Sequence, residues 1–537
     1  MRGQSRRRAE SLVCLLSVVC LSLVSVDARE EASSPNILLI VADDMGYSDL
    51  GCYGGEIRTP NLDSLAARGV RFTNYYVNNM CWPTRASLLT GLYPRTALVN
   101  KGNARGFRDE VRTLPEVLRE RGYATMMAGK WHLSDPELHD GPDTPQRRGF
   151  DQFYGTLHGA SDFFAPAGLN WNGKVVEHEW RDNPHYYYTD ALTNRALGFL
   201  ESHYSRQSKE SPFFLYLAFN AAHWPLHAKP EDIDAYKGHF SRGWDQLRRE
   251  RFARMKRLGV VNSDWKLSPR NSSVPSWEQE AHKAWQERRM EVYAAQVTSM
   301  DENIGRVIRY LEARGELDDT LVIFQHDNGG CHVEYLPERK GSWTRPRTTD
   351  GREIPIRPGN LPGVMPGPQS SFQSYGYGWA NLSNTPFRLY KQHDHEGGTR
   401  SPLIVSWPQG ISKERQGTIE PTLCHAIDMM PTLLALSGDS DFDQHPLALE
   451  GRAFDGELRG TAEQGETDRV LCWEHSKGRA IRSGAMKLVA VGKGPWELYD
   501  LVNDGTELHD LVREQPDVAA QLETQFNSWR TRTRMSR

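Results

Sequence analysis

Four apolar segments that each run directly into a polar cluster constrain the fold of this chain more than any other feature. The first, residues 36–41, is typical of a strand buried on both faces of a parallel sheet. The other three segments are 123–128, 213–219 and 320–325. In chain order, the polar residues that follow are Asp43-Asp44, Lys130-Trp131-His132, His223 and His326-Asp327-Asn328. Ligands of open α/β sheets bind beyond the carboxyl ends of the strands, so we expect these clusters to meet at one site.

Helix signals lie between these segments. Thr113-Leu114-Pro115 predicts a helix start and Gly122 its end, and Thr59-Pro60 and Gly69 predict a second helix. The alternation predicts an α/β fold with a mixed, mostly parallel sheet between helices. A further strand is expected at 403–405 and a last helix at 422–436.

After residue 440 the chain changes to short strand signals, at 485–491 and 496–499. We therefore predict a large domain over 35–440 and a small C-terminal α+β domain with an antiparallel sheet over 441–537.

Two segments of the large domain have the character of insertions, at about 230–290 and 335–380. Residues 237–289 hold 13 Lys and Arg against 6 Asp and Glu, with four interspersed tryptophans, which predicts a basic, partly helical insertion. Residues 341–377 are rich in Gly, Pro and Ser and lack periodicity, which predicts a long loop over the site.

The first 28 residues have the pattern of a signal peptide. Arginines at positions 2 and 6–8 precede an apolar run over 12–26, and Val26-Asp27-Ala28 fits a cleavage site. The apolar run is shorter than the roughly 20 residues that span a bilayer. We expect an exported protein, periplasmic, secreted or lysosome-like according to the host, with no stable membrane insertion.

The net charge and the number of cysteines argue against a nucleic-acid partner and against a fold held together by disulfides. The chain has 65 Lys and Arg against 69 Asp and Glu, so no global field favours nucleic acid. Removal of the signal peptide leaves five cysteines, Cys52, Cys81, Cys331, Cys424 and Cys472. An odd number leaves at least one thiol unpaired, and five are too few for a disulfide scaffold, although one or two bridges stay open.

The polar clusters include a set of oxygen ligands. Asp43 and Asp44 alone would more often be a helix cap and a surface acid. Asp327 and Asn328 follow a second strand and favour a metal site instead. Three carboxylates and an amide oxygen form a ligand set that suits Ca²⁺ or Mg²⁺. A zinc site would call for His or Cys ligands.

Cys81 is the candidate nucleophile. It opens a predicted helix, where the pKa of a thiol is lowered, although a free cysteine is more often a small buried hydrophobe. Pro83 at the helix start and Arg85 one turn on favour the reactive interpretation.

The segment from Cys81 to Gly91, Cys-x-Pro-x-Arg followed by Ala-Ser-Leu-Leu-Thr-Gly, resembles the signature of the type I sulfatases. In that family the cysteine is oxidised to formylglycine by a formylglycine-generating enzyme. Residues 384–391 and 395–398 resemble arylsulfatases, and the resemblance extends from about Asn36 to residues 496–501. It implies an alkaline-phosphatase-like fold.

The resemblance also implies a role for each matched residue. The implied calcium ligands are Asp43, Asp44, Asp327 and Asn328, with the formylglycine of Cys81 beside the metal. The residues that match those holding the aldehyde hydrate and the sulfate are Arg85, Lys130, His132, His223 and Lys391. The implied reaction is hydrolysis of an aryl sulfate or a sulfated carbohydrate through a covalent sulfo-formylglycine intermediate. Asp327 and His132 would then deprotonate the two hydroxyls, and His223 would protonate the leaving oxygen.

Two departures and two alternatives accompany this prediction. Trp82 stands where the family usually has a small residue, and His326 where Ser or Thr is common.

One alternative is a phosphonate or phosphate ester hydrolase of the same superfamily. The other is a non-enzymatic polyanion-binding protein that uses the basic insertion and its tryptophans. Aromatic residues over 150–171 and 180–188 could stack on an aryl group or a sugar ring.

Overall fold

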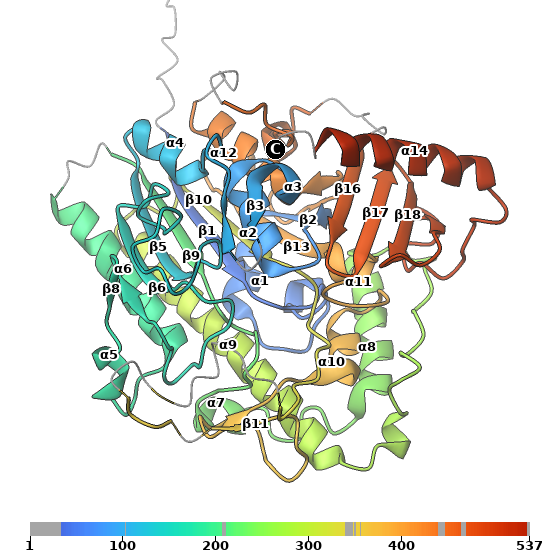
Figure 1. Cartoon of the computed structure of the whole chain (residues 1–537), viewed down its shortest axis with the longest axis horizontal. Helices are drawn as coiled ribbons and strands as arrows, with labels where there is room; N and C mark the ends of the chain where they lie inside the picture. Colours follow the sequence, from blue (N-terminus) through green and yellow to red (C-terminus); the bar gives the residue numbers. More distant parts are fainter. Residues whose placement is uncertain are drawn as a thin grey trace, which may run out of the picture. The chain divides into compact units, whose positions relative to one another are not determined.

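The polar clusters are carried by one large mixed sheet. The computed structural model describes residues 34–101, 104–206, 211–338, 347, 351–354, 356–438, 446–462 and 469–533. Within them, eleven strands form this sheet in the order β14-β2-β13-β10-β1-β9-β5-β6-β7-β8, with β15 beside β2 (Figure 1). The strands are β1 Asn36–Ala42, β2 Val70–Tyr76, β5 Ala124–Lys130, β6 Gln152–Thr156, β7 Asn170–Trp171, β8 Lys174–Val175, β9 Phe213–Ala218, β10 Thr320–His326, β13 Arg400–Ser406, β14 Ile419–Glu420 and β15 Cys424–His425.

The centre of the sheet is parallel and parts of its flanks are antiparallel. β1 pairs in parallel with β10 and β9, and β5 pairs in parallel with β9 and β6. β13 runs antiparallel to β10 and β2, and β7 runs antiparallel to β6 and β8. The predicted α/β class with a mostly parallel sheet is confirmed, and all four predicted strands lie in its parallel centre.

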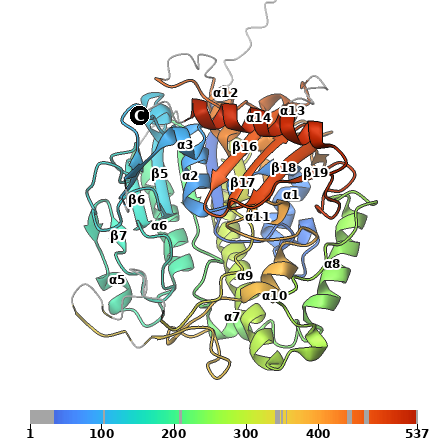
Figure 2. The same ribbon diagram turned by 45° about the vertical axis from the view of Figure 1, so that its right-hand side comes forward.

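Both faces of the sheet are covered, which explains the continuous apolar run of β1. Leu38 and Ile40 pack into one core, and Ile37, Leu39 and Val41 pack into the other. Helices α1, α6 and α9 lie on the first face, and α2, α4 and α12 lie on the second (Figures 1 and 2). Their bounds are α1 Pro60–Arg68, α2 Cys81–Thr90, α4 Leu114–Glu120, α6 Tyr188–Arg206, α9 Lys283–Ala313 and α12 Met429–Leu436.

A separate four-stranded antiparallel sheet follows near the carboxyl end, in the order β16-β17-β18-β19. Its strands are β16 Val470–His475, β17 Gly478–Ser483, β18 Met486–Val491 and β19 Glu497–Asp500, and helix α14, Pro516–Arg532, packs on β17 and β18. The predicted small α+β unit with an antiparallel sheet is confirmed. Residues Pro35–Arg537 form one compact unit, so the two sheets are parts of one body.

The remaining helices and strands lie outside the two sheets and the helices described above. They are β3 Leu98–Lys101, β4 Ala104–Phe107, β11 Arg357–Pro358, β12 Ser371–Phe372, α3 Pro94–Ala97, α5 His178–Arg181, α7 Pro230–Asp234, α8 Gly243–Leu258, α10 Gly376–Ser383, α11 Glu396–Thr399 and α13 Asp455–Arg459, with 3₁₀ turns at Gly51–Tyr53, Trp277–Gln279 and Ala426–Asp428. The insertion over 237–289 is partly helical through α8, as predicted. Within the described chain no helix is both long and apolar enough to cross a membrane.

The helix expected at 422–436 is shorter than predicted. Cys424 and His425 pair with β2 as β15, and the α-helix begins only at Met429. The backbone amide of His425 donates to Asp428 Oδ2 at 2.7 Å, which caps the 3₁₀ turn before the helix. The signal peptide predicted over 1–28 lies outside the described residues, as does part of the loop predicted over 341–377.

Candidate active site

The four predicted clusters meet at the carboxyl edge of the parallel strands. Ala42 at the end of β1 is in register with His326 at the end of β10, so the residues that follow these strands emerge side by side. Lys130 ends β5, and His223 follows β9 after a short turn. The side chains gathered there are all at most 8% exposed: Asp43, Asp44, Cys81, Arg85, Lys130, His132, His223, Asp327, Asn328 and Lys391. The structure therefore brings together all ten predicted site residues.

Cys81 lies at the amino end of α2 and inside this cluster. Its Sγ is 3.3 Å from His132 Nδ1 and 4.0 Å from Lys391 Nζ. Ligand atoms of Cys81, Asp43 and Asp327 all lie within 4.8 Å of one another. Pro83 is the third residue of the helix, not the first as expected.

Each buried carboxylate has a cationic partner. Lys130 Nζ donates to Asp43 Oδ2 at 2.5 Å, and Lys391 Nζ donates to Asp44 Oδ1. Arg85 donates from Nε and Nη2 to Asp327 Oδ2, at 3.0 and 2.8 Å. Buried charges are retained in proteins when they are paired in this way.

Three acceptor oxygens of the cluster are nevertheless buried without a hydrogen-bond donor: Asp43 Oδ1, Asp44 Oδ2 and Asn328 Oδ1. The amide group of Asn328 donates to Asp44 Oδ1 at 2.7 Å and to the Gly329 carbonyl at 2.9 Å, which leaves its own oxygen unpaired. Burial and the neighbouring Asp327 raise the pKa of Asp43 to about 8. Orphaned oxygens and a destabilised carboxylate indicate a place for a cation.

His223 faces the same carboxylates. Its Nε2 is 3.3 Å from Asp44 Oδ2, and its Nδ1 donates to the Trp224 carbonyl at 2.6 Å. Burial lowers the pKa of His223 well below its usual value, although Asp44 opposes this shift. Burial would raise the pKa of Asp44, but His223 and Lys391 together hold it below its usual value.

Two site residues have left-handed backbone conformations that non-glycine residues rarely adopt. Asp44 has φ of 61° and His132 has φ of 62°. Both follow the ends of parallel strands, where the sheet fixes the chain direction. Such strained residues gather at functional sites, where the surrounding structure holds them in place.

Tyr216 is a residue that the sequence interpretation missed. Arg85 Nη1 donates to its hydroxyl at 3.4 Å and to the Lys130 carbonyl at 3.0 Å, so Tyr216 helps to orient the guanidinium. A single hydroxyl-bearing residue within the apolar segment 213–219 was the available signal.

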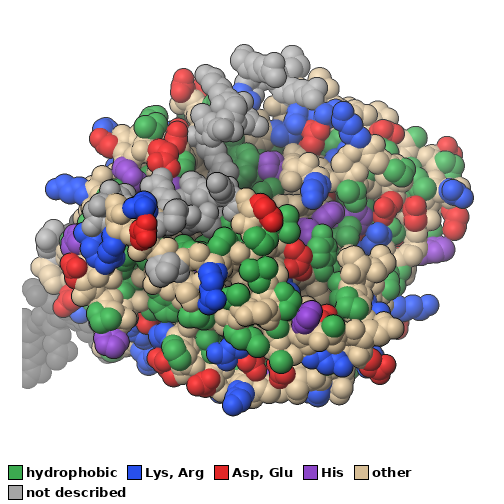
Figure 3. Space-filling view, turned by 60° about the horizontal axis from the view of Figure 1, so that its bottom comes forward, with side chains coloured by type: hydrophobic (Ala, Val, Ile, Leu, Met, Phe, Trp, Pro, Cys, Tyr) green, Lys and Arg blue, Asp and Glu red, His purple; other side chains and the backbone are tan. Residues whose placement is uncertain are grey.

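The basic insertion packs into the molecule. Trp244, Trp265 and Trp285 are all buried, and Trp277 contacts Trp244 edge to face at 4.7 Å. Charges of both signs are mixed on the face shown in Figure 3. These tryptophans contribute to packing, so they do not support the polyanion-binding alternative. The same holds for most aromatic residues over 150–188, including Phe150, Phe153 and Phe163.

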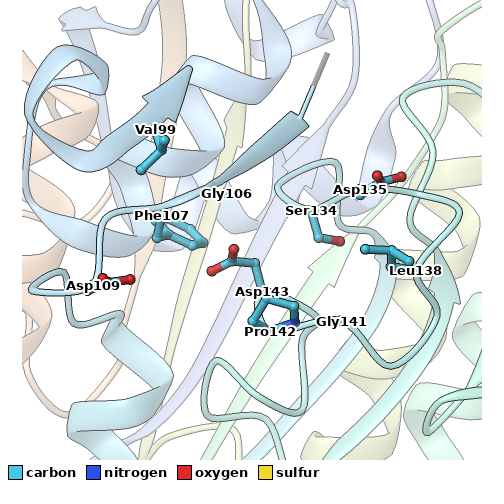
Figure 4. Close-up of a pocket in the computed structure, with 10 residues that line it drawn as sticks. All are labelled: Val99, Gly106, Phe107, Asp109, Ser134, Asp135, Leu138, Gly141, Pro142 and Asp143. Atoms are coloured by element: carbon cyan, nitrogen blue, oxygen red, sulfur yellow. The ribbon is translucent and has the colours of Figure 1, made fainter. Parts of the chain in front are cut away.

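A pocket of about 280 Å³ lies beside the chain segment that follows His132 (Figure 4). It is lined by Val99, Gly106, Phe107, Asp109, Ser134, Asp135, Leu138, Gly141, Pro142 and Asp143. None of the ten site residues lines it, so the chemistry of the buried cluster lies elsewhere.

Comparison with known proteins gives one consistent family. Residues 35–439 match the sulfatase family model, and residues 387–532 match the model of the N-sulphoglucosamine sulphohydrolase C-terminal region. An uncharacterised sulfatase of Schizosaccharomyces pombe is 34% identical over 93% of this chain and 94% of its own length. The arylsulfatase of Klebsiella aerogenes is 33% identical over 75% of this chain and 87% of its own.

Solved structures agree with the family match. The crystal structure of Ps i-CgsB has a TM-score of 0.65 and 27% identity, covering 93% of both chains. The phosphonate monoester hydrolase of Agrobacterium radiobacter has a TM-score of 0.54 at 20% identity, covering 93% of this chain and 96% of its own, so it shares the fold.

Proposed function

The chain belongs to the sulfatase family of sulfuric ester hydrolases, and we propose that it cleaves sulfate esters with a formylglycine made from Cys81 beside a bound calcium ion. The observation that carries this proposal is the position of Cys81. Its Sγ lies among the ligand atoms of Asp43 and Asp327, with His132 and Lys391 around it.

The residues present fit a calcium ion. Asp43, Asp44, Asp327 and Asn328 would hold it, because they supply only oxygen ligands and three of their oxygens are buried without donors. When bound, the ion supplies positive charge for the sulfate oxygens and for the attacking group. Asp43, Asp327 and Asp44 are paired with Lys130, Arg85 and Lys391, so a bound ion would share these carboxylates with the three cationic side chains.

Formylglycine would supply an aldehyde hydrate with two hydroxyl groups, one to attack sulfur and one to release sulfate. His132 is placed to take a proton from this position, since its Nδ1 is 3.3 Å from Cys81 Sγ. Lys391 Nζ, 4.0 Å from the same sulfur, would stabilise negative charge on the sulfate.

His223 is the candidate general acid. Its Nδ1 hydrogen is committed to the Trp224 carbonyl, so Nε2, which faces the cluster, is the nitrogen that would gain and lose the exchangeable proton. Burial lowers the pKa of His223, so Nε2 would have to take up a proton before it passes that proton to a departing alkoxide or phenoxide.

We further propose a substrate class, a maturation step and a cellular location. The substrate is a sulfated small molecule or a sulfated glycan. Support comes from relatives named as carbohydrate sulfatases, such as the human N-acetylgalactosamine-6-sulfatase, 28% identical over 78% of this chain and 67% of its own. A formylglycine-generating enzyme or an equivalent maturase would modify Cys81. Export through the signal peptide would bring the enzyme to its substrate outside the cytoplasm.

The proposal is tested by measuring the modification of Cys81 and the sulfatase activity of the same protein. Protein made with a maturase is digested with trypsin, and the mass of the peptide that holds Cys81 is measured beside turnover of 4-nitrophenyl sulfate. We expect loss of the thiol, gain of the aldehyde, and activity in proportion to conversion. Cys81→Ala should be inactive. Full activity with an unmodified thiol would refute the formylglycine mechanism.

A further inference from the structure

The turn between β16 and β17, His475–Gly478, lies against the segment that carries Cys81. Asn79 Nδ2 donates to the His475 carbonyl at 3.0 Å. The imidazole of His475 meets the indole of Trp82 edge to face, with ring centroids 4.8 Å apart. The small sheet therefore contacts the chain on both sides of Cys81.

The same turn also lies against the segment that carries Lys391. The backbone amide of Gln392 donates to the Asn79 carbonyl at 2.7 Å, which joins the two segments. A Cβ atom on Gly478 would lie 2.4 Å from Asp394 Oδ2, so only glycine permits this close approach. The turn is thus fixed beside both reactive positions.

Aromatic and imidazole rings pack next to this junction. His332 contacts the rings of Tyr377, Tyr390 and His393, with centroids 4.8, 5.0 and 5.5 Å apart. Burial lowers the pKa of His332 to about 3 and of His393 to about 4, and the positive charge of Lys477 adds to both shifts. Both rings are therefore uncharged near neutral pH.

Lys477 is exposed, and no ion pair joins it to another described residue. Glu474, three residues earlier, is occupied by Arg95 and Arg530. Lys391, by contrast, is buried and paired with Asp44. Lys477 follows His475 by two residues, or at most roughly 7 Å of chain. Lys477 is thus an exposed ammonium group two residues from a ring that packs against Trp82, the neighbour of Cys81.

We propose that Lys477 binds a second anionic group of the substrate, a sulfate or a carboxylate carried near the scissile sulfate. This inference rests on the proposed function and specifies its substrate class as multiply charged sulfate esters. Trp82, which is only partly buried beside His475, offers apolar ring surface for the ring that carries both anions. The neutral His332 and His393 offer no competing charge.

The experiment measures binding of probe pairs that differ by one anion. The first pair is 4-nitrophenyl sulfate and 3-carboxy-4-nitrophenyl sulfate, and the second is glucosamine 6-sulfate and glucosamine 2-N,6-O-disulfate. Calorimetric Kd values are obtained with calcium-loaded Cys81→Ala, which leaves the probes intact, and with Cys81→Ala carrying Lys477→Ala or Lys413→Ala. Lys413 is an exposed lysine in another part of the chain.

We expect a roughly tenfold preference for the dianionic member of at least one pair, lost in Lys477→Ala and kept in Lys413→Ala. Lys477→Glu should reverse the preference. If both pairs give the same Kd ratios with and without Lys477, the inference is wrong. Turnover of 4-nitrophenyl sulfate by aldehyde-verified enzyme tests the proposed function separately, so either can fail without the other.

Discussion

Arg85 holds Asp327 by a single oxygen: both Nε and Nη2 donate to Oδ2, at 3.0 and 2.8 Å. The other oxygen, Oδ1, accepts a weaker contact from the Asp44 amide at 3.3 Å. The pair therefore orients one carboxylate oxygen toward the amide that follows β1. The arginine of the Cys-x-Pro-x-Arg motif thus fixes an acid that is 242 residues away in the sequence.

Removal of a proposed calcium ligand should abolish turnover. We expect Asp43→Ala and Asp327→Ala each to lower kcat/KM for 4-nitrophenyl sulfate by at least roughly 100-fold, because each removes a charge from the cation. Calcium bound per chain, measured by atomic emission, should fall in parallel. Asp135→Ala, outside the cluster, is the control and should retain both. A fully active Asp43→Ala protein loaded with zinc would refute the calcium assignment.

The site should prefer sulfate to phosphate esters. A phosphate monoester is mostly a dianion near neutral pH and a sulfate ester a monoanion. Lys130, Arg85 and Lys391 are each paired with one of the three aspartates, so a bound divalent ion would match the charge of a sulfate ester and its attacking oxygen. We expect a larger kcat/KM for 4-nitrophenyl sulfate than for 4-nitrophenyl phosphate or a phenylphosphonate ester. Lys391→Ala should reduce this preference about tenfold. A preference for the phosphonate would favour the other hydrolase class.

Asp394 should make stability depend on pH. Burial raises its pKa to about 8, far above the usual value of an unfolded aspartate. The folded state therefore binds the extra proton, so the contribution of Asp394 is complete below about pH 4 and is lost as pH rises through about 8. Asp394→Asn removes the ionisation. In thermal unfolding at pH 5 and pH 8, the gain in Tm over the wild type should be larger at pH 8. An equal gain at both values would contradict the assignment.

Lys487 should be essential to the junction between the two sheets. Its Nζ is 2.7 Å from Glu396 Oε1 and 3.1 Å from Glu507 Oε1, and all three side chains are buried. Lys487→Met leaves two carboxylates without their shared cation, which typically costs about 3–5 kcal/mol. Chemical denaturation should show this loss, whereas Lys413→Met at the surface should change the free energy of unfolding by less than about 0.5 kcal/mol. Equal effects in the two variants would show that the buried cluster contributes no net stability.

The sequence by itself determined the parallel core and the members of the site. Continuous apolar runs require burial on both faces, and polar residues directly after them must emerge at the carboxyl edge, so Asp43, Lys130, His223 and Asp327 could be grouped without coordinates. These inferences depend on short-range pattern and on one general property of parallel sheets. The start of the last helix could not be predicted in this way, because pairing of Cys424 with β2 overrides local preference.

Only the tertiary structure decided which charges are paired and which side chains are buried. The sequence does not show whether the tryptophans of the insertion face solvent or a core, because the same residues stand among basic side chains in either case. In the structure, Trp244 and Trp277 pack against Trp379 and are part of a core. The contacts of His475 with Asn79 and Trp82, on either side of Cys81, join residues almost 400 positions apart. No local pattern encodes such a contact, because it depends on how a second sheet packs against the first.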